Sequence, residues 1–337
     1  MIREKHKQPG VCYAMTDDGV ELPVMDVTHP AFAESINPEK ADALVKDFLE
    51  FQKSPAFFRR LFSRNSIAMR GLDSASNKFL GGMTTYIAKL GPGILGRGYS
   101  GWVDRKVAGG IGSVAFRIRL QETARLIAEA LEPQLAPRKN CPLHLLNLGG
   151  GPAMDSLNAL ILLHKDRPEC LADRRISIHV LDLDRAGPSF GARAAAALCS
   201  EGAPLHGLQL AFEYVPYDWN HVSNLRKILG PLETECIVIG SSEGGLFEYG
   251  SDESIVGNLR ELGKVGFPGF VLIGSLFREG TIQRWLQTAN RIPIRMFERT
   301  DFEKLVTGAG WSLLRVLEDN PIYRVVSLGA VEKITSV

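Results

Sequence analysis

The residues best suited to chemistry gather around one glycine-rich turn. A short apolar run, 143–148, ends at Gly149-Gly150-Gly151, and a helical pattern follows from Met154. A buried strand, a tight glycine turn and a helix start are typical of the nucleotide-binding turn of a doubly wound α/β sheet. Glycine there lets the backbone approach a ligand without a Cβ clash. The ligand that the turn holds would decide the chemistry.

Details of the turn favour a nucleoside ligand without phosphates. A dinucleotide turn of the form Gly-x-Gly-x-x-Gly/Ala would place its third position on Met154, whereas Gly-x-Gly-x-Gly/Ala is satisfied by Gly149, Gly151 and Ala153. Pro152 lacks the N–H that a pyrophosphate cradle would use. No Gly-Lys-Ser/Thr is present, which excludes a P-loop. Because glycine turns also follow strands for structural reasons alone, that alternative stays open at this point.

Carboxylates follow the second predicted strand. The run 176–184 ends in Asp182-Leu183-Asp184. A carboxylate at the tip of this strand can accept hydrogen bonds from both ribose hydroxyls. We expect Asp182 to be this ligand and Asp184 to cap the next helix.

Two further clusters follow the third and fourth strands. Asp218 is suited to accept the adenine amino proton, and Trp219 or Tyr217 to pack on the ring; alternatively, Asp218 only helps to start a helix at Asn220. The next cluster, Ser241-Ser242-Glu243, comes where the strand order of an open α/β sheet reverses, and ligands bind at that crevice. Glu243 is interpreted as a general base or an anchor for an ammonium group, with a solvated turn as the alternative.

The elements that must position these residues form two regions. Residues before 141 predict helices and irregular structure without buried strands, with helix starts at Asn37-Pro38 and Ser54-Pro55 and a helix over 114–131 closed by Pro133. From 143 onward, short apolar strands alternate with helices, which implies a parallel sheet covered on both faces. The predicted strands are 143–148, 176–182, 208–215, 235–240, 268–274, 311–317 and 323–331. The predicted helices are 154–164, 186–200, 220–229, 252–264, 280–290 and 301–308, with caps at Asn220 and a capping box at Thr300–Glu303. The last two strands are too close for a helical crossover, so they form an antiparallel hairpin.

Over residues 143–331 the chain resembles a class I S-adenosylmethionine-dependent methyltransferase. The segment 145–153 matches the first motif of the family, Asp182 its ribose-binding acid, Asp218 its adenine-side position, and the hairpin 311–331 its antiparallel seventh strand. An ordinary NAD-binding domain lacks that hairpin. The resemblance implies an α/β fold: a Rossmann-like seven-stranded sheet with an antiparallel C-terminal hairpin, plus a helical N-terminal cap.

The resemblance also implies a division of labour and a reaction. Residues 1–140 would be a cap and substrate lid, and 141–337 the domain that binds S-adenosylmethionine and transfers its methyl group to an unidentified small-molecule acceptor. The implied cofactor-binding residues are Asn147, Gly149, Gly150, Gly151, Asp182, Leu183, Asp218, Trp219, Ser241 and Ser242. Candidates for a base are Glu243, His221 and Tyr249, although a lone histidine just inside a helix start is more often structural.

Two positions depart from the family pattern. Asn147 stands where an acidic residue is common, so it can hydrogen-bond but brings no charge. Ala153 stands where a third glycine is common, and it fits if its backbone angles are ordinary.

The N-terminal cap also contains candidate substrate residues. Its glycine-rich segment has the lid candidates Tyr86, Lys89, Tyr99 and Trp102. Arg117 or Arg119 would face the pocket, with surface charge as the alternative for at least one of them.

Two other functions fit parts of the pattern. An NAD(P)-dependent oxidoreductase is supported only by the glycine turn and Asp182. A non-catalytic S-adenosylmethionine-binding protein of the same fold would keep every motif and lack transfer.

The composition of the chain limits the kinds of partner that we expect it to bind. The 337 residues carry a net charge of +1, so no basic excess favours nucleic acid. Five dispersed cysteines have no metal-ligand spacing and predict free thiols and no metal site. The N-terminus lacks a secretory apolar region, and no apolar run approaches the roughly 18 residues of a membrane span, so we expect a cytoplasmic protein without membrane contact. A homo-oligomer is compatible with the sequence.

Overall fold

The computed structural model describes residues 7–53, 81–96, 101–232, 235–280, 283–284, 287 and 293–331. The helix start predicted at Ser54-Pro55, the lid candidate Tyr99 and most of the helix predicted over 280–290 lie outside these residues.

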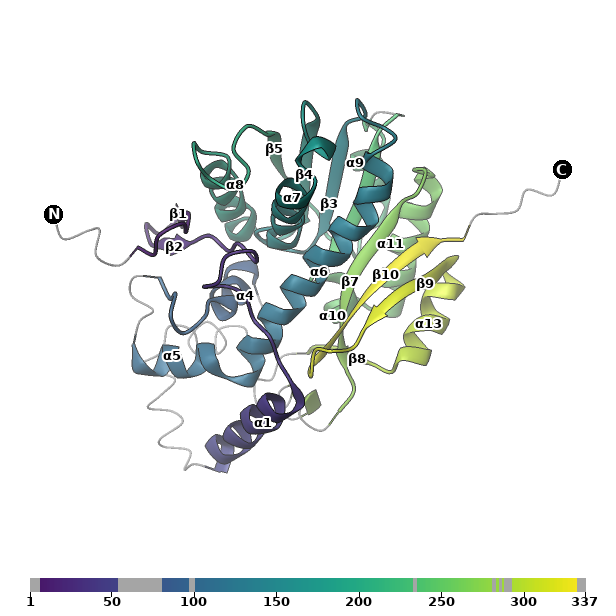
Figure 1. Cartoon of the computed structure of the whole chain (residues 1–337). Coiled ribbons are helices and arrows are strands. Elements are labelled where there is room, and N and C mark those ends of the chain that lie inside the picture. The colour runs from purple at the N-terminus through teal and green to yellow at the C-terminus, as the bar shows by residue number, and fades with distance from the viewer. Residues whose placement is uncertain are drawn as a thin grey trace.

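The centre of the fold is a mixed sheet in the order β5-β4-β3-β6-β7-β10-β9, with the short strand β8 paired to β7. The first five of these strands are parallel, and β10 is antiparallel to both β7 and β9. This confirms the predicted Rossmann-like fold and its C-terminal hairpin; the two-residue β8 was not predicted (Figure 1). The strands are β3 (Leu143–Leu148), β4 (Arg175–Asp182), β5 (Gln209–Pro216), β6 (Ile237–Ser242), β7 (Val271–Arg278), β8 (Met296–Phe297), β9 (Trp311–Leu317) and β10 (Tyr323–Ala330).

Helices cover both faces of the sheet because the central strands are apolar on both sides. Leu143 and Leu145 of β3 pack into a core that contains residues of α6 (Ile111–Leu135), α7 (Met154–Asp166) and α8 (Ala186–Leu198). Leu146 and Leu148 pack into a second core with α9 (Ser223–Leu229), α11 (Asp252–Val265) and α13 (Arg299–Gly308). Side chains alternate between the faces of a strand, and a strand buried on both faces reads as a continuous apolar run. The short helices η1 (Pro168–Cys170) and α10 (Leu246–Tyr249) complete this part of the chain.

The described N-terminal elements that precede α6 are β1 (Tyr13–Met15), β2 (Glu21–Pro23), α1 (Pro38–Lys53), α4 (Gly82–Lys89) and α5 (Trp102–Gly109). Of these, β1, β2 and α4 pack into the first of the two cores, whereas α1 packs against a smaller cluster that includes Ile111 and Ala115 of α6. Leu22 of β2 lies in the same core as α7, and Asn158 of α7 accepts the Val27 N–H at 2.8 Å and donates to the Met25 carbonyl at 3.2 Å. The long helix α6 crosses the molecule between these elements and the sheet (Figure 1). The β1–β2 hairpin corrects the expectation of no buried strands before residue 141. Each of its strands has only three residues, which is too short to give a recognisable pattern in the sequence.

Several helix boundaries test the predicted caps. Asn37 accepts the Lys40 N–H at 2.8 Å, which confirms the predicted start of α1. The cap at Asn220 and the capping box at Thr300 are wrong: α9 begins at Ser223 and α13 at Arg299, neither with a side-chain cap. Pro133 does not close α6, which continues to Leu135. Tertiary burial of Leu135 holds this last turn although the proline removes one hydrogen bond.

None of the helices among the described residues is long and apolar enough to cross a membrane.

Candidate functional site

The glycine turn between β3 and α7 has three residues with left-handed backbone angles: Gly149 (φ 66°), Gly151 (φ 55°) and Ala153 (φ 52°). Gly151 lies between Gly82 of α4 and Gly187 of α8. A Cβ on Gly82 would be 2.6 Å from the Gly151 Cα, and one on Gly187 would be 2.7 Å from it. The turn is therefore enclosed by backbone on two sides. The expectation of ordinary angles at Ala153 is wrong, because the chain must enter α7 in a conformation that favours glycine.

A buried polar group lies directly beneath the turn. Asn147 donates from Nδ2 to Asp155 Oδ1 at 2.7 Å and to Ser241 Oγ at 3.0 Å. A Cβ on Gly150 would lie 2.0 Å from Asn147 Oδ1. Both Asn147 Oδ1 and Asp155 Oδ2 are buried and have no hydrogen-bond partner among the described residues. Burial, followed by the negative charge of Glu243, raises the pKa of Asp155 to about 6.

Asp182 lies at the tip of β4, as predicted, and is buried. Its Oδ2 accepts the Gly151 N–H at 3.0 Å and its Oδ1 accepts the Asp184 N–H at 2.9 Å. Burial raises the pKa of Asp182, although these backbone bonds oppose the shift. The carboxylate thus holds the glycine turn and can still accept a hydrogen bond from a ligand.

Two adjoining pockets open at the carboxyl ends of β3, β4 and β6. We call them the Lys89 pocket and the Asp182 pocket. Their volumes are about 330 and 360 Å³, part of it open to solvent. The Lys89 pocket is lined by Gly82, Thr85, Tyr86, Lys89, Gly149, Gly150, Pro152, Met154, Glu243 and Gly244. The Asp182 pocket is lined by Gly82, Gly149, Asp182, Leu183, Trp219, Gly244 and Tyr249. The N-terminal helix α4 therefore contributes to both pockets.

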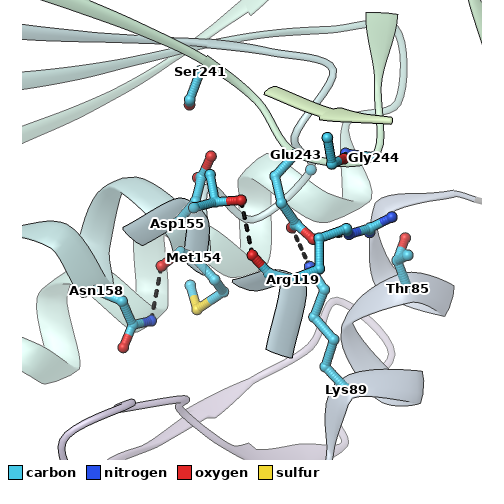
Figure 2. Close-up of polar contacts among 12 residues, drawn as sticks. Thr85, Lys89, Arg119, Met154, Asp155, Asn158, Ser241, Glu243 and Gly244 are labelled. Carbon is cyan, nitrogen blue, oxygen red and sulfur yellow. Dashed lines mark hydrogen bonds and ion pairs between the residues drawn. The ribbon is translucent and has the colours of Figure 1, made fainter. Parts of the chain in front are cut away.

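A buried chain of charges begins at Lys89 and Glu243 in the lining of the Lys89 pocket and continues to Arg119 (Figure 2). Glu243 accepts from Arg119 Nε at 2.5 Å with one oxygen and is ion-paired with Lys89 Nζ through the other. Arg119 Nη1 donates to Glu248 at 2.9 Å, and Ser275 donates to the same Glu248 oxygen at 2.7 Å. The Arg119 guanidinium also lies 4.8 Å from the Phe116 ring centroid and 4.5 Å from that of Tyr323.

This arrangement shifts the acid strength of its members in different directions. Burial would raise the pKa of Glu243, but Arg119 and Lys89 hold it below its ordinary value. Burial, with repulsion from Arg119, lowers the pKa of Lys89 against the attraction of Glu243. Burial raises the pKa of Glu248. Glu243 is thus a fixed anion, while Lys89 releases its proton more readily than an ordinary lysine.

Most of the predicted site residues meet at these pockets. Those that line a pocket are Gly149, Gly150, Asp182, Leu183, Trp219, Glu243 and Tyr249. Asn147, Gly151 and Ser241 lie in the turn or beneath it. Ser242 is buried, donates to the Leu148 carbonyl at 2.8 Å and accepts the Leu246 N–H at 2.9 Å.

Asp218 and His221 are not among the residues that line the pockets, although Asp218 directly precedes Trp219, which lines the Asp182 pocket. Asp218 accepts the Asn220 N–H at 2.9 Å with one oxygen and contacts His221 Nδ1 at 3.0 Å with the other. The His221 side chain is 72% exposed. Asp218 therefore stabilises its own turn in this structure, without the helix start at Asn220 that the sequence suggested.

The cap candidates have different surroundings. Tyr86 is buried and donates to the Pro23 carbonyl at 2.5 Å, whereas Trp102 is 63% exposed. Both Arg117 and Arg119 are buried, so the interpretation of one as surface charge is wrong. Arg117 forms an ion pair with Glu34 at 2.6 Å and is not among the residues that line the pockets.

Sequence reasoning missed Gly82, Thr85 and Asp155. Asp155 had a signal, since it is an acid in the first helical turn after the glycines. Gly82 and Thr85 had none, because their place depends on how α4 packs on the turn.

No group of three His, Cys, Asp or Glu among the described residues is arranged to hold a metal ion. Cys12, Cys141, Cys170 and Cys199 are free thiols.

Comparison with known proteins gives fold-level similarity. No family model matches the sequence, and no curated protein matches it. A possible exported protein from Bordetella parapertussis aligns with a TM-score of 0.54 and 14% identity, covering 88% of this chain and 100% of that one. The mitomycin 7-O-methyltransferase MmcR aligns at 0.40 and 15% identity, covering 68% of this chain and 57% of its own. Human N-acetylserotonin methyltransferase, in complex with S-adenosylmethionine, aligns at 0.37 and 15%, covering 67% and 58%.

This chain spans little more than half the length of those two enzymes, and TM-scores this low support no functional conclusion. The strand order and the antiparallel β10 confirm a class I methyltransferase-like fold over residues 143–331.

Proposed function

We propose that this protein binds S-adenosylmethionine and transfers its methyl group to a small-molecule acceptor. The observation that carries the proposal is the pair of unpartnered buried oxygens, Asn147 Oδ1 and Asp155 Oδ2, beneath the glycine turn. A buried acceptor without a donor costs about 1–3 kcal/mol. Two such acceptors together, one on a carboxylate, favour a ligand that brings an ammonium group to this place.

The residues present fit this donor. Asn147 and Asp155 would hold its ammonium group, and Asp182 would accept hydrogen bonds from its ribose hydroxyls beside those from the backbone. Trp219 and Leu183 line the Asp182 pocket and would pack on the adenine, with Asp218 as the proposed partner of the adenine amino group. When bound, S-adenosylmethionine supplies an electrophilic methyl group on a sulfonium.

The protein's own contribution is alignment of two reactants and exclusion of water. Gly149 and Gly82 border both pockets, so a ligand in one pocket lies next to a ligand in the other. We propose that residues 1–140 form the cap and substrate lid and 141–337 the donor-binding domain. Support for this role comes from α4, which covers the glycine turn with Gly82 at its first residue and Lys89 at its last.

Thermal unfolding with added ligands tests the proposal. S-adenosylhomocysteine should raise the melting temperature in a concentration-dependent way, because a ligand that binds only the folded state stabilises it by mass action. NAD(H) and NADP(H) should give no shift. Stabilisation by a nicotinamide dinucleotide alone would replace this proposal with an oxidoreductase. Stabilisation by S-adenosylhomocysteine without methyl transfer to any tested acceptor would support a non-catalytic binding protein.

A further inference from the structure

We propose that Lys89 is the catalytic residue that deprotonates the methyl acceptor, and that the acceptor is an acidic hydroxyl of the phenol or enol class. This inference rests on the proposed function and deepens it. It starts from a charged side chain that the N-terminal helix α4 sends into the crevice of the sheet.

Lys89 is the last residue of α4, and its side chain is only 7% exposed. Of the ten residues that line the Lys89 pocket, only Lys89 and Glu243 are charged. Gly149 and Gly150 of the turn form another part of the same lining. An acceptor on the Lys89 side of this pocket would therefore lie next to the turn that is proposed to hold the methyl donor.

Glu243 is poorly suited to take the acceptor's proton. Its two oxygens are bonded to Arg119 and Lys89, and both cations favour its ionised form. A carboxylate of lowered pKa is a weak base. Its position instead orients Lys89, in the arrangement of a base held by a third group.

Lys89 has the complementary properties. Burial and the nearby Arg119 favour its neutral amine, and Glu243 is placed to hold the ammonium that forms when the amine accepts a proton. In the proposed step, the acceptor hydroxyl gives its proton to Nζ of Lys89. The acceptor oxygen then forms a bond to the methyl carbon as the carbon–sulfur bond breaks, and that bond's electron pair goes to sulfur. The products are the methyl ether, the neutral sulfide and a Lys89 ammonium paired with Glu243.

The acid strength of the base determines which class of acceptor it can deprotonate. Proton transfer is effective when the two groups have similar pKa values. The pKa of an ammonium group is closer to that of a phenol or enol than to that of an aliphatic alcohol. A neutral amine acceptor already has a nucleophilic lone pair and needs no base before attack. The Lys89 ammonium would also stabilise the negative charge of a phenolate or enolate. In the lining of this pocket, Glu243 is the only side chain whose charge would offset that of the ammonium.

A spectroscopic titration of 4-nitrophenol tests the inference without turnover, because its phenolate absorbs visible light and its phenol does not. The probe is titrated with the full-length protein, with and without S-adenosylhomocysteine. We expect saturable binding, with the bound probe ionising at a pH about one unit lower than the free probe, a tenfold change in the phenolate-to-phenol ratio. Lys89→Met should abolish this shift, while Lys165→Met, an exposed lysine near the end of α7, should keep it.

A second variant separates catalysis from a structural ion pair. Lys89→Arg keeps the cation beside Glu243 but cannot serve as a base. With unsubstituted phenol as acceptor, which stays protonated at neutral pH, the wild-type rate should rise with pH through the ionisation of Lys89, and Lys89→Arg should lose that rise and most of its rate while retaining its melting temperature. A wild-type pH profile in Lys89→Arg, equal ionisation in Lys89→Met, or no saturable probe binding would overturn the inference. Because the probe titration is also run without nucleoside, failure of S-adenosylhomocysteine to bind would refute the proposed function separately.

Discussion

The side-chain nitrogen of Asn147 lies 2.7 Å from a carboxylate oxygen of Asp155. Asn147 lies near the end of β3, at the position where the resemblance stated in the sequence analysis implies an acid. Asp155, in the first turn of α7, brings a carboxylate to the same buried place beneath Gly150. The charge that the sequence lacks at Asn147 is therefore supplied from the following helix.

The first prediction concerns the pH dependence of binding. Burial raises the pKa of Asp155 to about 6, and an ammonium group binds the ionised form. Between pH 5 and 7 the ionised fraction rises about tenfold, so affinity for S-adenosylhomocysteine should rise roughly tenfold over this range. Isothermal titration calorimetry at constant ionic strength measures it. Asp155→Asn should remove the dependence, and Asp166→Asn, at the exposed end of the same helix, should preserve it. A wild-type affinity that stays constant over this range would exclude Asp155 as the ammonium ligand.

The second prediction concerns Asp182, the proposed ribose ligand. Asp182→Ala removes a charged acceptor of two hydroxyl hydrogen bonds, each worth about 1.5–3 kcal/mol. Affinity for S-adenosylhomocysteine should fall at least about a hundredfold. Asp184→Ala is the control. The one hydrogen bond described to the Asp184 carboxylate comes from the Ala186 N–H at 3.0 Å. Calorimetry on both variants at matched temperature gives the comparison. Equal affinity in wild type and Asp182→Ala would assign the ribose to another residue.

Gly82 provides a third prediction, on the contact between α4 and the glycine turn. A methyl group on Gly82 would lie 2.6 Å from the Gly151 Cα, so α4 must move away from the turn. Gly82→Ala should therefore lower the free energy of unfolding by about 1–3 kcal/mol despite alanine's higher helix propensity. Gly112→Ala is a matched control near the start of α6, where a Cβ would meet nothing within 4 Å. Urea unfolding that shows equal or higher stability for Gly82→Ala would refute the close packing.

The sequence predicted the parts of the site that local patterns encode. The glycine turn follows a buried strand, and Asp182 ends the next strand, so both positions follow from the order of elements along the chain. Leu183 and Trp219 were placed by the same reasoning. The apolar runs and the short final connection likewise predicted the parallel sheet and its antiparallel hairpin.

The remaining features depend on tertiary contacts between distant segments. Lys89 meets Glu243 across 154 positions of sequence, and nothing in the local pattern of α4 specifies that partner. Arg119 has hydrophobic neighbours on its own helix that suggest burial, but the sequence does not show which carboxylates pair with it. The cap predicted at Asn220 failed because Asn220 Oδ1 instead accepts a hydrogen bond from Ser254 of α11 at 2.8 Å. Propensity and caps are local preferences, and such packing overrides them.

The last prediction concerns Arg174, which holds the end of α6 to the sheet domain. Arg174 is 2% exposed, and its guanidinium donates only to backbone carbonyls in its described hydrogen bonds. The acceptors are Leu135 at 3.2 Å, Arg138 at 2.9 Å, Cys170 at 3.1 Å and Cys141. The carbonyls at a helix end have no partner within the helix and favour a cation.

Arg174→Met keeps most of the side-chain volume and removes all four of these hydrogen bonds, although the Leu135 and Arg138 carbonyls each keep a backbone N–H donor at 3.3 Å. It should therefore cost about 3 kcal/mol or more in free energy of unfolding. Arg167→Met is the control, since Arg167 is 51% exposed and pairs with Glu132 of α6 at 2.9 Å. A surface pair of this kind is worth about 0–1 kcal/mol. Urea unfolding of both variants gives the two differences. A loss below 1 kcal/mol in Arg174→Met would show that packing of Leu131 and Leu135 alone holds the end of α6.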